Sequence, residues 1–408
     1  MDKFSINGPC KVRGKVKISG SKNSSLPILA ATLLFDQPVE IKNLPKVKDI
    51  DTMFSLLKSL GSKIILSKDR RTAKIHNKKK IKTFASYSLV KTMRGSILVL
   101  GPLISKYYQA KISLPGGCLI GARPINYHLD SLKKLGMKYV LKDGYIIAKS
   151  KGKLKGKVFK FPKISVGATE NSIIAACLAK GTTILKNCAI EPEIKDLTNF
   201  LNSAGAKIIW NGRKCKINGV NSLNKTNYSV MSDRIEAGTF CIAATITKGN
   251  LEIVNFDSKI IKTELNLLKK FGAKIQTNEK RILIKGPEHI KPIRNIKTKE
   301  YPGVSTDMQS QLMVLMCKAN GQSSITENIF ENRFMHVAEL RRLGAKIDIE
   351  KNKATIEGNT KFIGAELMSS DLRASVSLVL GAMISKGKST INRIYHLDRG
   401  YENIENKL

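Results

Sequence analysis

The sequence predicts an α/β fold made of six repeated modules of about seventy residues, grouped as two domains of three modules. One pattern is a helix-period apolar segment that closes on a glycine before a short strand. It recurs at Gly61, Gly136, Gly205, Gly272 and Gly344, with intervals of 75, 69, 67 and 72 residues. The other pattern is a helix rich in small residues, which recurs six times. A repeat of this length exceeds a solenoid unit and has room for a small sheet.

The small-residue helices open the modules. Their sequences are SSLPILAATLL, RGSILVLGPLI, NSIIAACLAKG, AGTFCIAATITKG, QSQLMVLMCKANG and RASVSLVLGAMISKG. Between helices, β-branched residues cluster as they do in strands, for example at 15–19, 39–42 and 183–185. Six small-residue helices begin modules, but only five glycines of the repeat end them. We therefore expect the last strand of the sixth module to be missing after Leu408. The polar passage 221–232 is expected to connect the two domains, with ligands in the cleft between them.

Composition indicates a globular cytoplasmic protein. The chain has 408 residues, of which 42% are apolar, enough for ordinary cores. We find no signal-peptide pattern and no apolar run long enough to span a membrane. The seven cysteines are odd in number, scattered and without CxxC spacing. They predict free thiols in a reducing cytoplasm, with neither a disulfide framework nor a zinc site.

The formal net charge of +39 suggests a nucleic-acid partner at first sight. However, 56 of the 71 basic residues are lysines spread along every segment. The basic runs at 78–82 and 151–157 lack aromatic residues for base stacking, so we expect no specific nucleic-acid binding. Arginine suits forked recognition of phosphate and carboxylate. Those in distinctive stretches are Arg94, Arg123, Arg234, Arg333, Arg373 and Arg399.

The stretch 114–130, LPGGCLIGARPINYHLD, predicts a ligand-binding loop between a strand and a helix. Gly116 and Gly117 permit a tight turn. Positive charge from Arg123 and His128 is expected to lower the pKa of the Cys118 thiol, which then transfers a proton or attacks carbon. The alternative is a surface hairpin loop with a free cysteine.

Other motifs leave two interpretations open. The sequence SGSKN at 19–23 predicts an anion site at a helix N-terminus, with Lys22 as a cation and Pro27 in the first turn, or else an ordinary N-cap. Asp233 and Asp307 fit N-cap positions, and Asp307 is alternatively a base for a sugar hydroxyl.

Three charged groups lie in the last two modules. Arg333, in the block ENRFMH, is interpreted as part of a salt bridge or as a ligand contact, and the same choice holds for Asp371 with Arg373. Arg399, beside Gly400, either binds an anion or is solvated.

Eight stretches together resemble the successive motifs of the UDP-N-acetylglucosamine enolpyruvyl transferases, which act at the first committed step of bacterial peptidoglycan synthesis. They run in the same order from residue 4 to the end, as SGSKNSSLPILAA, SLPGGCLIGARPINYHL, KISVGATENSI, DRIEAGTF, STDMQSQ, ENIFENRFMHVAEL, SSDLRAS and RIYHLDRGYENIE. The resemblance implies a two-domain inverse α/β barrel, with residues 22–232 in one domain and 1–21 plus 233–408 in the other.

The resemblance also implies the reaction. The enolpyruvyl group of phosphoenolpyruvate is transferred to the 3'-hydroxyl of UDP-N-acetylglucosamine, by addition through a tetrahedral ketal and then loss of phosphate. It implies no metal or organic cofactor. The implied partners are these two small molecules, in a cytoplasmic enzyme without membrane insertion, and we expect a monomer.

Site residues follow by motif position. Cys118 is implied as the proton donor to the methylene carbon and the target of fosfomycin, and Asp307 as the acceptor of the hydroxyl proton. Phosphoenolpyruvate is expected at Lys22, Asn23, Arg123 and Arg399. The sugar nucleotide is expected at Arg94, Arg123, Pro124, Ile125, Asn126, Tyr127, Lys163, Ile164, Ser165, Val166, Asp307 and Ile329. The supporting residues are His128, Arg333, Asp371 and Arg373.

The chain departs from the family pattern at Ser21, where alanine is frequent, at Asn126, where an acidic residue is usual, and in its early end. Two rival functions are kept. One is enolpyruvyl transfer to shikimate 3-phosphate, which the cysteine loop and the ARPINYHL run disfavour. The other is an inactive paralogue or a nucleic-acid-binding protein, for which a steep salt dependence of binding is the test.

Overall fold

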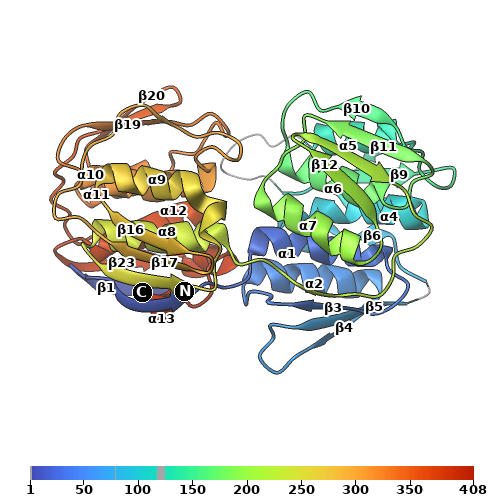
Figure 1. Cartoon of the computed structure of the whole chain (residues 1–408), viewed down its shortest axis with the longest axis horizontal. Helices are drawn as coiled ribbons and strands as arrows, with labels where there is room; N and C mark the ends of the chain where they lie inside the picture. Colours follow the sequence, from blue (N-terminus) through green and yellow to red (C-terminus); the bar gives the residue numbers. More distant parts are fainter. Residues whose placement is uncertain (1, 79, 117–124) are drawn as a thin grey trace. The chain divides into compact units, whose positions relative to one another are not determined.

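The structure, a computed structural model, describes residues 2–78, 80–116 and 125–408. The described chain divides into two compact units (Figure 1). We call residues 20–116 and 125–231 the Lys22 unit, and residues 2–19 and 232–408 the Asp307 unit. Each unit has its own hydrophobic core.

The Lys22 unit contains three four-stranded sheets. The first runs in the order β14 (Asn227–Ser229), β3 (Val39–Lys42), β5 (Ala73–Asn77), β4 (Ser62–Leu66). The second runs β6 (Phe84–Ala85), β7 (Gln109–Ser113), β9 (Tyr145–Lys149), β8 (Lys138–Lys142). The third runs β10 (Val158–Lys160), β11 (Thr182–Lys186), β13 (Lys214–Asn218), β12 (Lys207–Asn211). The described helices are α1 (Lys22–Ala31), η1 (Thr32–Leu34), α2 (Lys48–Leu60), α3 (Tyr87–Val90), η2 (Arg94–Val99), α4 (Leu100–Tyr107), α5 (Asn126–Lys134), α6 (Val166–Ala176) and α7 (Pro192–Ser203).

The Asp307 unit repeats this arrangement. One sheet runs β2 (Arg13–Lys17), β15 (Asn250–Val254), β17 (Arg281–Lys285), β16 (Lys274–Asn278). Another runs β18 (Ile296–Lys297), β19 (Ser323–Thr326), β21 (Lys353–Ile356), β20 (Ile347–Glu350). The third runs β22 (Glu366–Met368), β23 (Gly387–Asn392), β1 (Lys3–Gly8). The described helices are α8 (Arg234–Ile246), η3 (Ser258–Ile261), α9 (Lys262–Phe271), η4 (Thr306–Met308), α10 (Gln309–Cys317), α11 (Val337–Arg342), α12 (Leu372–Met383), η5 (Ile394–Arg399) and α13 (Ile404–Lys407).

Each module pairs its central strand in parallel with one neighbour and antiparallel with the other, as β15 does with β2 and β17. In the sixth sheet β1 supplies the antiparallel neighbour of β23, with Lys3 opposite Asn392 and Gly8 opposite Gly387. Among the described residues this sheet has three strands where each of the other five has four, in agreement with the expectation that the sixth module lacks its last strand. A strand from the start of the chain satisfies the backbone groups that would otherwise form an open edge.

A strand at the end of the third module also joins the sheet of another module. Within the polar passage 221–232, β14 lies parallel to β3 of the first module. The passage is thus partly a strand, although its residues show no strong alternation.

The small-residue helices form the interior of each unit, and the sheets lie around them (Figure 1). Every residue of α8, α10 and α12 is buried. Small side chains permit this close packing: a Cβ at Gly101 would lie 2.3 Å from Asn171 Oδ1, and one at Gly238 would lie 2.4 Å from Met308 Sδ. The predicted α/β class with six modules is confirmed.

The five glycines of the repeat have φ between +92° and +113°, and Gly61 and Gly272 are the left-handed C-caps of α2 and α9. The prediction from the repeat is confirmed. One detail is wrong: α1 begins at Lys22, so Pro27 lies inside the helix beyond its first turn. Among the described residues, no helix has the length and apolar character needed to cross a membrane.

Candidate active site

Three of the predicted site residues, Cys118, Arg123 and Pro124, lie outside the described residues. The others fall in both units. The Lys22 unit contains Lys22, Asn23, Arg94, 125–128 and 163–166, and the Asp307 unit contains Asp307, Ile329, Arg333, Asp371, Arg373 and Arg399.

Asp307 lies in η4 at the start of the fifth module. The helix is capped by Ser305, whose Oγ accepts a hydrogen bond from Asp307 N at 3.2 Å, so a capping role for Asp307 is wrong. Its carboxylate instead accepts hydrogen bonds from Arg333 and, at 2.9 Å, from Arg373. The Asp307 side chain is 24% exposed, while those of Arg333 and Arg373 are 5% and 8% exposed. Two buried guanidinium groups therefore fix a carboxylate that remains partly accessible.

Arg373 is oriented by the first turn of α12. Asp371 is the N-cap, and its Oδ1 accepts hydrogen bonds from Arg373 N at 2.9 Å and Ala374 N at 3.2 Å. Of the two interpretations left open for Asp371 and Arg373, the salt bridge between them is not the one observed, because the guanidinium pairs with Asp307. Burial lowers the pKa of Arg373, but the charges of Asp307 and Tyr401 outweigh it and leave the pKa above its ordinary value.

A buried polar network behind Asp307 was missed by the sequence analysis. Gln311 Nε2 donates to the Asp307 carbonyl at 3.1 Å and to Thr239 Oγ1 at 3.2 Å. Thr239 Oγ1 lies 2.8 Å from the hydroxyl of Tyr401, whose ring lies beneath the Arg373 guanidinium. The i,i+4 spacing of Asp307 and Gln311 was the available signal.

Ile329 lies in the loop that follows β19. Glu327, which is buried, accepts hydrogen bonds from Ile329 N at 2.8 Å and from Thr306 Oγ1 at 2.9 Å. This carboxylate attaches the loop to η4, so Ile329 and Asp307 belong to one local structure. Glu327 was not predicted, since a lone glutamate in a strand-end stretch gives no pattern.

Lys22 is the first residue of α1. Ser21 caps the helix, accepting from Ser24 N at 3.3 Å, so the motif is an N-cap whose next residue is also a cation. Lys22 Nζ lies 3.3 Å from Asp49 Oδ2, and these side chains are 10% and 6% exposed. Asn23 is not buried, unlike the rest of α1. Asp49, from the first turn of α2, was not predicted.

The charge of His128 differs from the positive charge that the sequence predicts for this residue. Burial, followed by the charge of Arg94, lowers the pKa of His128 to about 4. The imidazole is therefore neutral at pH 7 and contributes no positive charge to a neighbouring thiol. Its Nδ1 lies 3.1 Å from Asn171 Nδ2, and Gly167 leaves the space that its ring fills.

Asn171 of α6 connects its own helix to α5 and η2, which also carry predicted nucleotide-binding residues. Besides His128 in α5, its side chain bonds Ile97 O in η2 at 3.1 Å and Gly101 N in α4 at 2.7 Å. Arg94 begins η2, Asn126 begins α5, and Val166 begins α6 after its cap Ser165. Of the described members of this set, Arg94, 125–127 and 163–166 thus lie at or just before the starts of η2, α5 and α6 in one unit.

Arg399 ends η5, which packs against α12. The following Gly400 packs against Leu372 of α12, since a Cβ there would lie 2.6 Å from Leu372 Cδ2. Burial and then the charge of Arg399 lower the pKa of the neighbouring His396. Arg399 is therefore held near the helix start that also carries Arg373.

The described cysteines contain no disulfide, and Cys177, Cys188, Cys215, Cys241 and Cys317 are buried free thiols. Burial raises the pKa of each of these five. Within residues 2–78, 80–116 and 125–408, no group of three His, Cys, Asp or Glu side chains could hold a metal ion.

Comparison with known proteins identifies the class first. The sequence model of the family described as EPSP synthase (3-phosphoshikimate 1-carboxyvinyltransferase) matches residues 6–408. Among solved structures, the enolpyruvyl transferase NikO from Streptomyces tendae has a TM-score of 0.90 at 22% identity, covering 100% of this chain and 96% of that one. EPSP synthase from Acinetobacter baumannii has a TM-score of 0.76 at 20% identity, covering 97% and 95%. The fold is that of the enolpyruvyl transferases, as predicted.

The particular branch follows from closer relatives. UDP-N-acetylglucosamine 1-carboxyvinyltransferase of Pelagibacter ubique is 61% identical over 409 residues, with 100% of this chain and 97% of the relative covered. The enzyme of the same name from Endomicrobium trichonymphae is 48% identical, with the same coverage. The chain belongs to the UDP-N-acetylglucosamine 1-carboxyvinyltransferase family.

Proposed function

We propose that this protein transfers the enolpyruvyl group of phosphoenolpyruvate to the 3'-hydroxyl of UDP-N-acetylglucosamine with release of phosphate. The names of relatives with up to 61% identity support this substrate pair. The single structural observation that carries the proposal is the partly exposed Asp307 carboxylate, fixed by buried Arg333 and Arg373. In this orientation it accepts the proton of the sugar hydroxyl as the oxygen attacks.

The proposed chemistry is addition followed by elimination. The 3'-oxygen adds to C2 of phosphoenolpyruvate while Cys118 donates a proton to C3, which gives a tetrahedral ketal. Loss of phosphate and of a proton from C3 then restores the enol ether. Neither half requires a metal or organic cofactor.

Phosphoenolpyruvate is proposed to bind to Lys22, Asn23, Arg123 and Arg399. Lys22 is supported by its position at the N-terminus of α1, where the helix dipole also favours an anion. Its contact with Asp49 holds the ammonium in one direction. Fixed cations at this position would stabilise the charge of the ketal and of the departing phosphate.

The sugar nucleotide is proposed to bind to Arg94, the run 123–127, the segment 163–166, Asp307 and Ile329. The described members of the first three groups are supported by their places at the starts of η2, α5 and α6, where backbone N–H groups favour an anion, and Asn171 links these helices. His128, Arg333, Asp371 and Arg373 are positioning residues in this proposal. We also propose that residues 22–232 form one domain and that residues 1–21 plus 233–408 form the other.

The proposed role is the first committed step of peptidoglycan synthesis, and so in cell-wall formation, cell shape and division. We propose a cytoplasmic location, small-molecule partners and a monomer. Fosfomycin is proposed to alkylate Cys118. Transfer to shikimate 3-phosphate is the rival activity, since the matching family is described by the 3-phosphoshikimate enzyme.

The test is phosphate release from phosphoenolpyruvate by the purified chain. We expect release that requires UDP-N-acetylglucosamine, that shikimate 3-phosphate does not support, and that fosfomycin stops. Circular dichroism of the same sample checks that the protein is folded. Release with shikimate 3-phosphate, or no release from folded protein with either acceptor, would overturn the proposal.

A further inference from the structure

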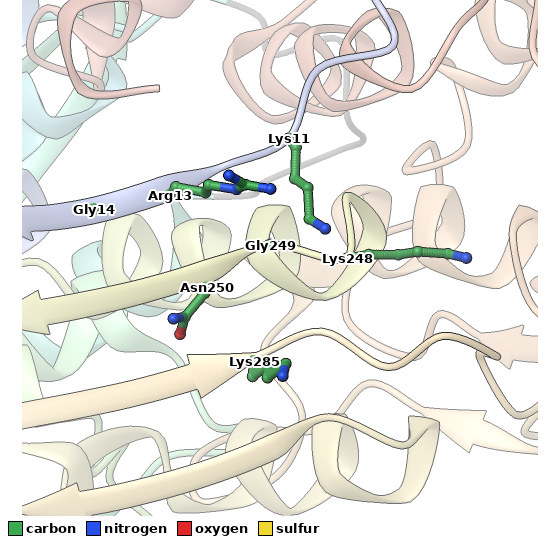
Figure 2. A pocket seen from close by; sticks show the side chains of 7 residues that line it. All are labelled: Lys11, Arg13, Gly14, Lys248, Gly249, Asn250 and Lys285. Carbon is green, nitrogen blue, oxygen red and sulfur yellow. The ribbon is translucent and has the colours of Figure 1, made fainter.

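We propose that the Asp307 unit carries a binding site for a compact multivalent anion, such as a diphosphate group, where β2, β15 and β17 lie side by side. The site does not depend on the function proposed above. It is a cavity of about 360 Å³. Its lining residues are Lys11, Arg13, Gly14, Lys248, Gly249, Asn250 and Lys285 (Figure 2).

Strand register places two cations of this cavity, Arg13 and Lys285, in one row with Asn250. Arg13 of β2 lies opposite Asn250 of β15, and Asn250 lies opposite Lys285 of β17. Because adjacent strands are about 4.8 Å apart, the backbones of Arg13 and Lys285 are about 10 Å apart. Figure 2 shows Lys11 and Arg13 coming from the segment above and Lys285 from the strand below. Two acid groups of one small ligand can therefore each meet a cation, with the Asn250 amide between them.

The cations in this row lack the acidic partners that the same strands provide elsewhere. At the middle of the sheet Glu252 pairs with Lys15 at 4.0 Å and with Arg281 at 3.0 Å. At the cavity, Lys248 pairs with Glu288 at 2.9 Å. For Lys11, Arg13 and Lys285, the described part of the chain shows no ion pair. Arg13 and Lys285 flank Asn250 across the sheet, so an anion bound between them would neutralise positive charge that no described ion pair offsets.

Glu288 is the acidic group that faces the cavity cations. The hydrogen bond from Lys248, then the charges of Lys248 and Lys11, lower the pKa of Glu288. Glu288 therefore offsets charge at Lys248 and Lys11, while Arg13 and Lys285 have no described ion pair.

Backbone geometry decides which anions fit. A Cβ at Gly249 would lie 2.3 Å from Val12 O, while Gly14, at φ +108°, has open space beside it. The floor is therefore backbone and the walls are Lys, Arg and Asn. None of the described residues that line the cavity is aromatic and able to stack on a base, which favours a compact anion over nucleic acid.

The experiment is calorimetric titration of the full chain with inorganic pyrophosphate at low ionic strength, where exposed charges are least screened. The double variant Arg13→Gln/Lys285→Gln is compared with Lys269→Gln/Lys270→Gln. The control removes the same charge from the exposed end of α9 in the same unit. We expect affinity to fall roughly tenfold in the first variant and to stay at the parental value in the second.

A second variant, Asn250→Asp, places a carboxylate in the middle of the row and is expected to abolish the same binding event. Phosphate release should be unchanged in all these variants, which separates this site from the one proposed for the substrates. Equal pyrophosphate affinity in the parent and the Arg13→Gln/Lys285→Gln variant would overturn the proposal. So would a single-stranded oligonucleotide that binds this row tighter than pyrophosphate does.

Discussion

The Arg373 guanidinium donates to Asp307 Oδ2 at 2.9 Å, and not to Asp371, the nearby acid that was one of its two possible partners. Asp371 caps α12 through backbone amides and so turns the arginine toward the beginning of the fifth module. Residues 66 positions apart are thereby joined around one carboxylate. This pair gives the first prediction.

Arg373→Lys should lower kcat/KM by at least about tenfold while leaving the fold intact. Lysine keeps the charge but cannot reproduce the planar, forked geometry that orients Asp307. Phosphate-release kinetics measure the effect. Arg342→Lys, at an exposed arginine of the same unit, is the control and should match the parent. Parental kinetics for Arg373→Lys would mean that this pair does not position the carboxylate.

Asp307→Asn should reduce kcat by about 10² to 10⁴, the usual contribution of a general base, with a much smaller change in KM. The amide accepts a hydrogen bond but takes no proton from the hydroxyl. Asp348→Asn, at an exposed position of β20, serves as the matched control. If Asp307→Asn raised KM and left kcat unchanged, Asp307 would be a binding group and not the base.

Cys118→Ser should lose about 10² or more in turnover, whereas Cys118→Asp should stay active and resist fosfomycin, since a carboxyl group donates a proton without a sulfur nucleophile. Activity assays with and without fosfomycin distinguish the two variants. Cys10→Ser, which removes the partly exposed thiol of the other unit, should behave as the parent. Full turnover by Cys118→Ala would refute the assigned role.

His128 should make the protein less stable in acid. Its pKa is about 4 in the folded protein against an ordinary 6.5, so the unfolded chain binds more protons between these values. The free energy of unfolding therefore falls as pH drops from 6.5 to 4, by about 1.4 kcal/mol per pH unit for this histidine. In His128→Gln, urea unfolding at several pH values should show a slope smaller by that amount.

His336 also contributes to the pH dependence in that experiment, because burial lowers its pKa to about 4 as well. It should contribute a second, similar slope that His128→Gln leaves in place. His76→Gln, at an exposed position of β5, should retain the parental slope. An unchanged slope in His128→Gln would show that the imidazole is not held neutral.

Lys407→Met should destabilise the Asp307 unit by roughly 3 kcal/mol or more, because it removes the cation from a buried pair. Lys407 Nζ donates to Glu236 Oε1 at 2.6 Å and to Ser19 Oγ at 2.7 Å. Burial raises the pKa of Glu236 to about 7, with Lys407 opposing the shift. Stability from this acid is thus lost as pH rises from about 4.5 to 7, and in Lys407→Met the loss should continue to higher pH.

Urea unfolding between pH 5 and 9 measures this effect. Adding Glu236→Gln should restore part of the stability and remove the extra pH dependence, since no buried carboxylate remains. If Lys407→Met unfolded at the parental urea concentration across this range, the pair would have no structural role.

The sequence by itself determined the modular fold. Gly61 and its four counterparts end helices because only glycine takes positive φ without strain, and this signal is local. The small-residue helices were equally predictable from the sequence, because close helix packing requires small residues in each of the six modules. Asp233 was correctly placed as the N-cap of α8 for the same reason: a cap depends on the next three residues.

Only the tertiary structure decided which groups meet. The partners of Asp307 come from 26 and 66 residues away, and Asp49 reaches Lys22 from another helix, so no local pattern contains them. The charge of His128 was misjudged because burial, which the sequence does not show, removes its proton. The first strand completes the last sheet for a similar reason. Hydrogen bonding between strands depends on their proximity in space, and sequence distance places no limit on it.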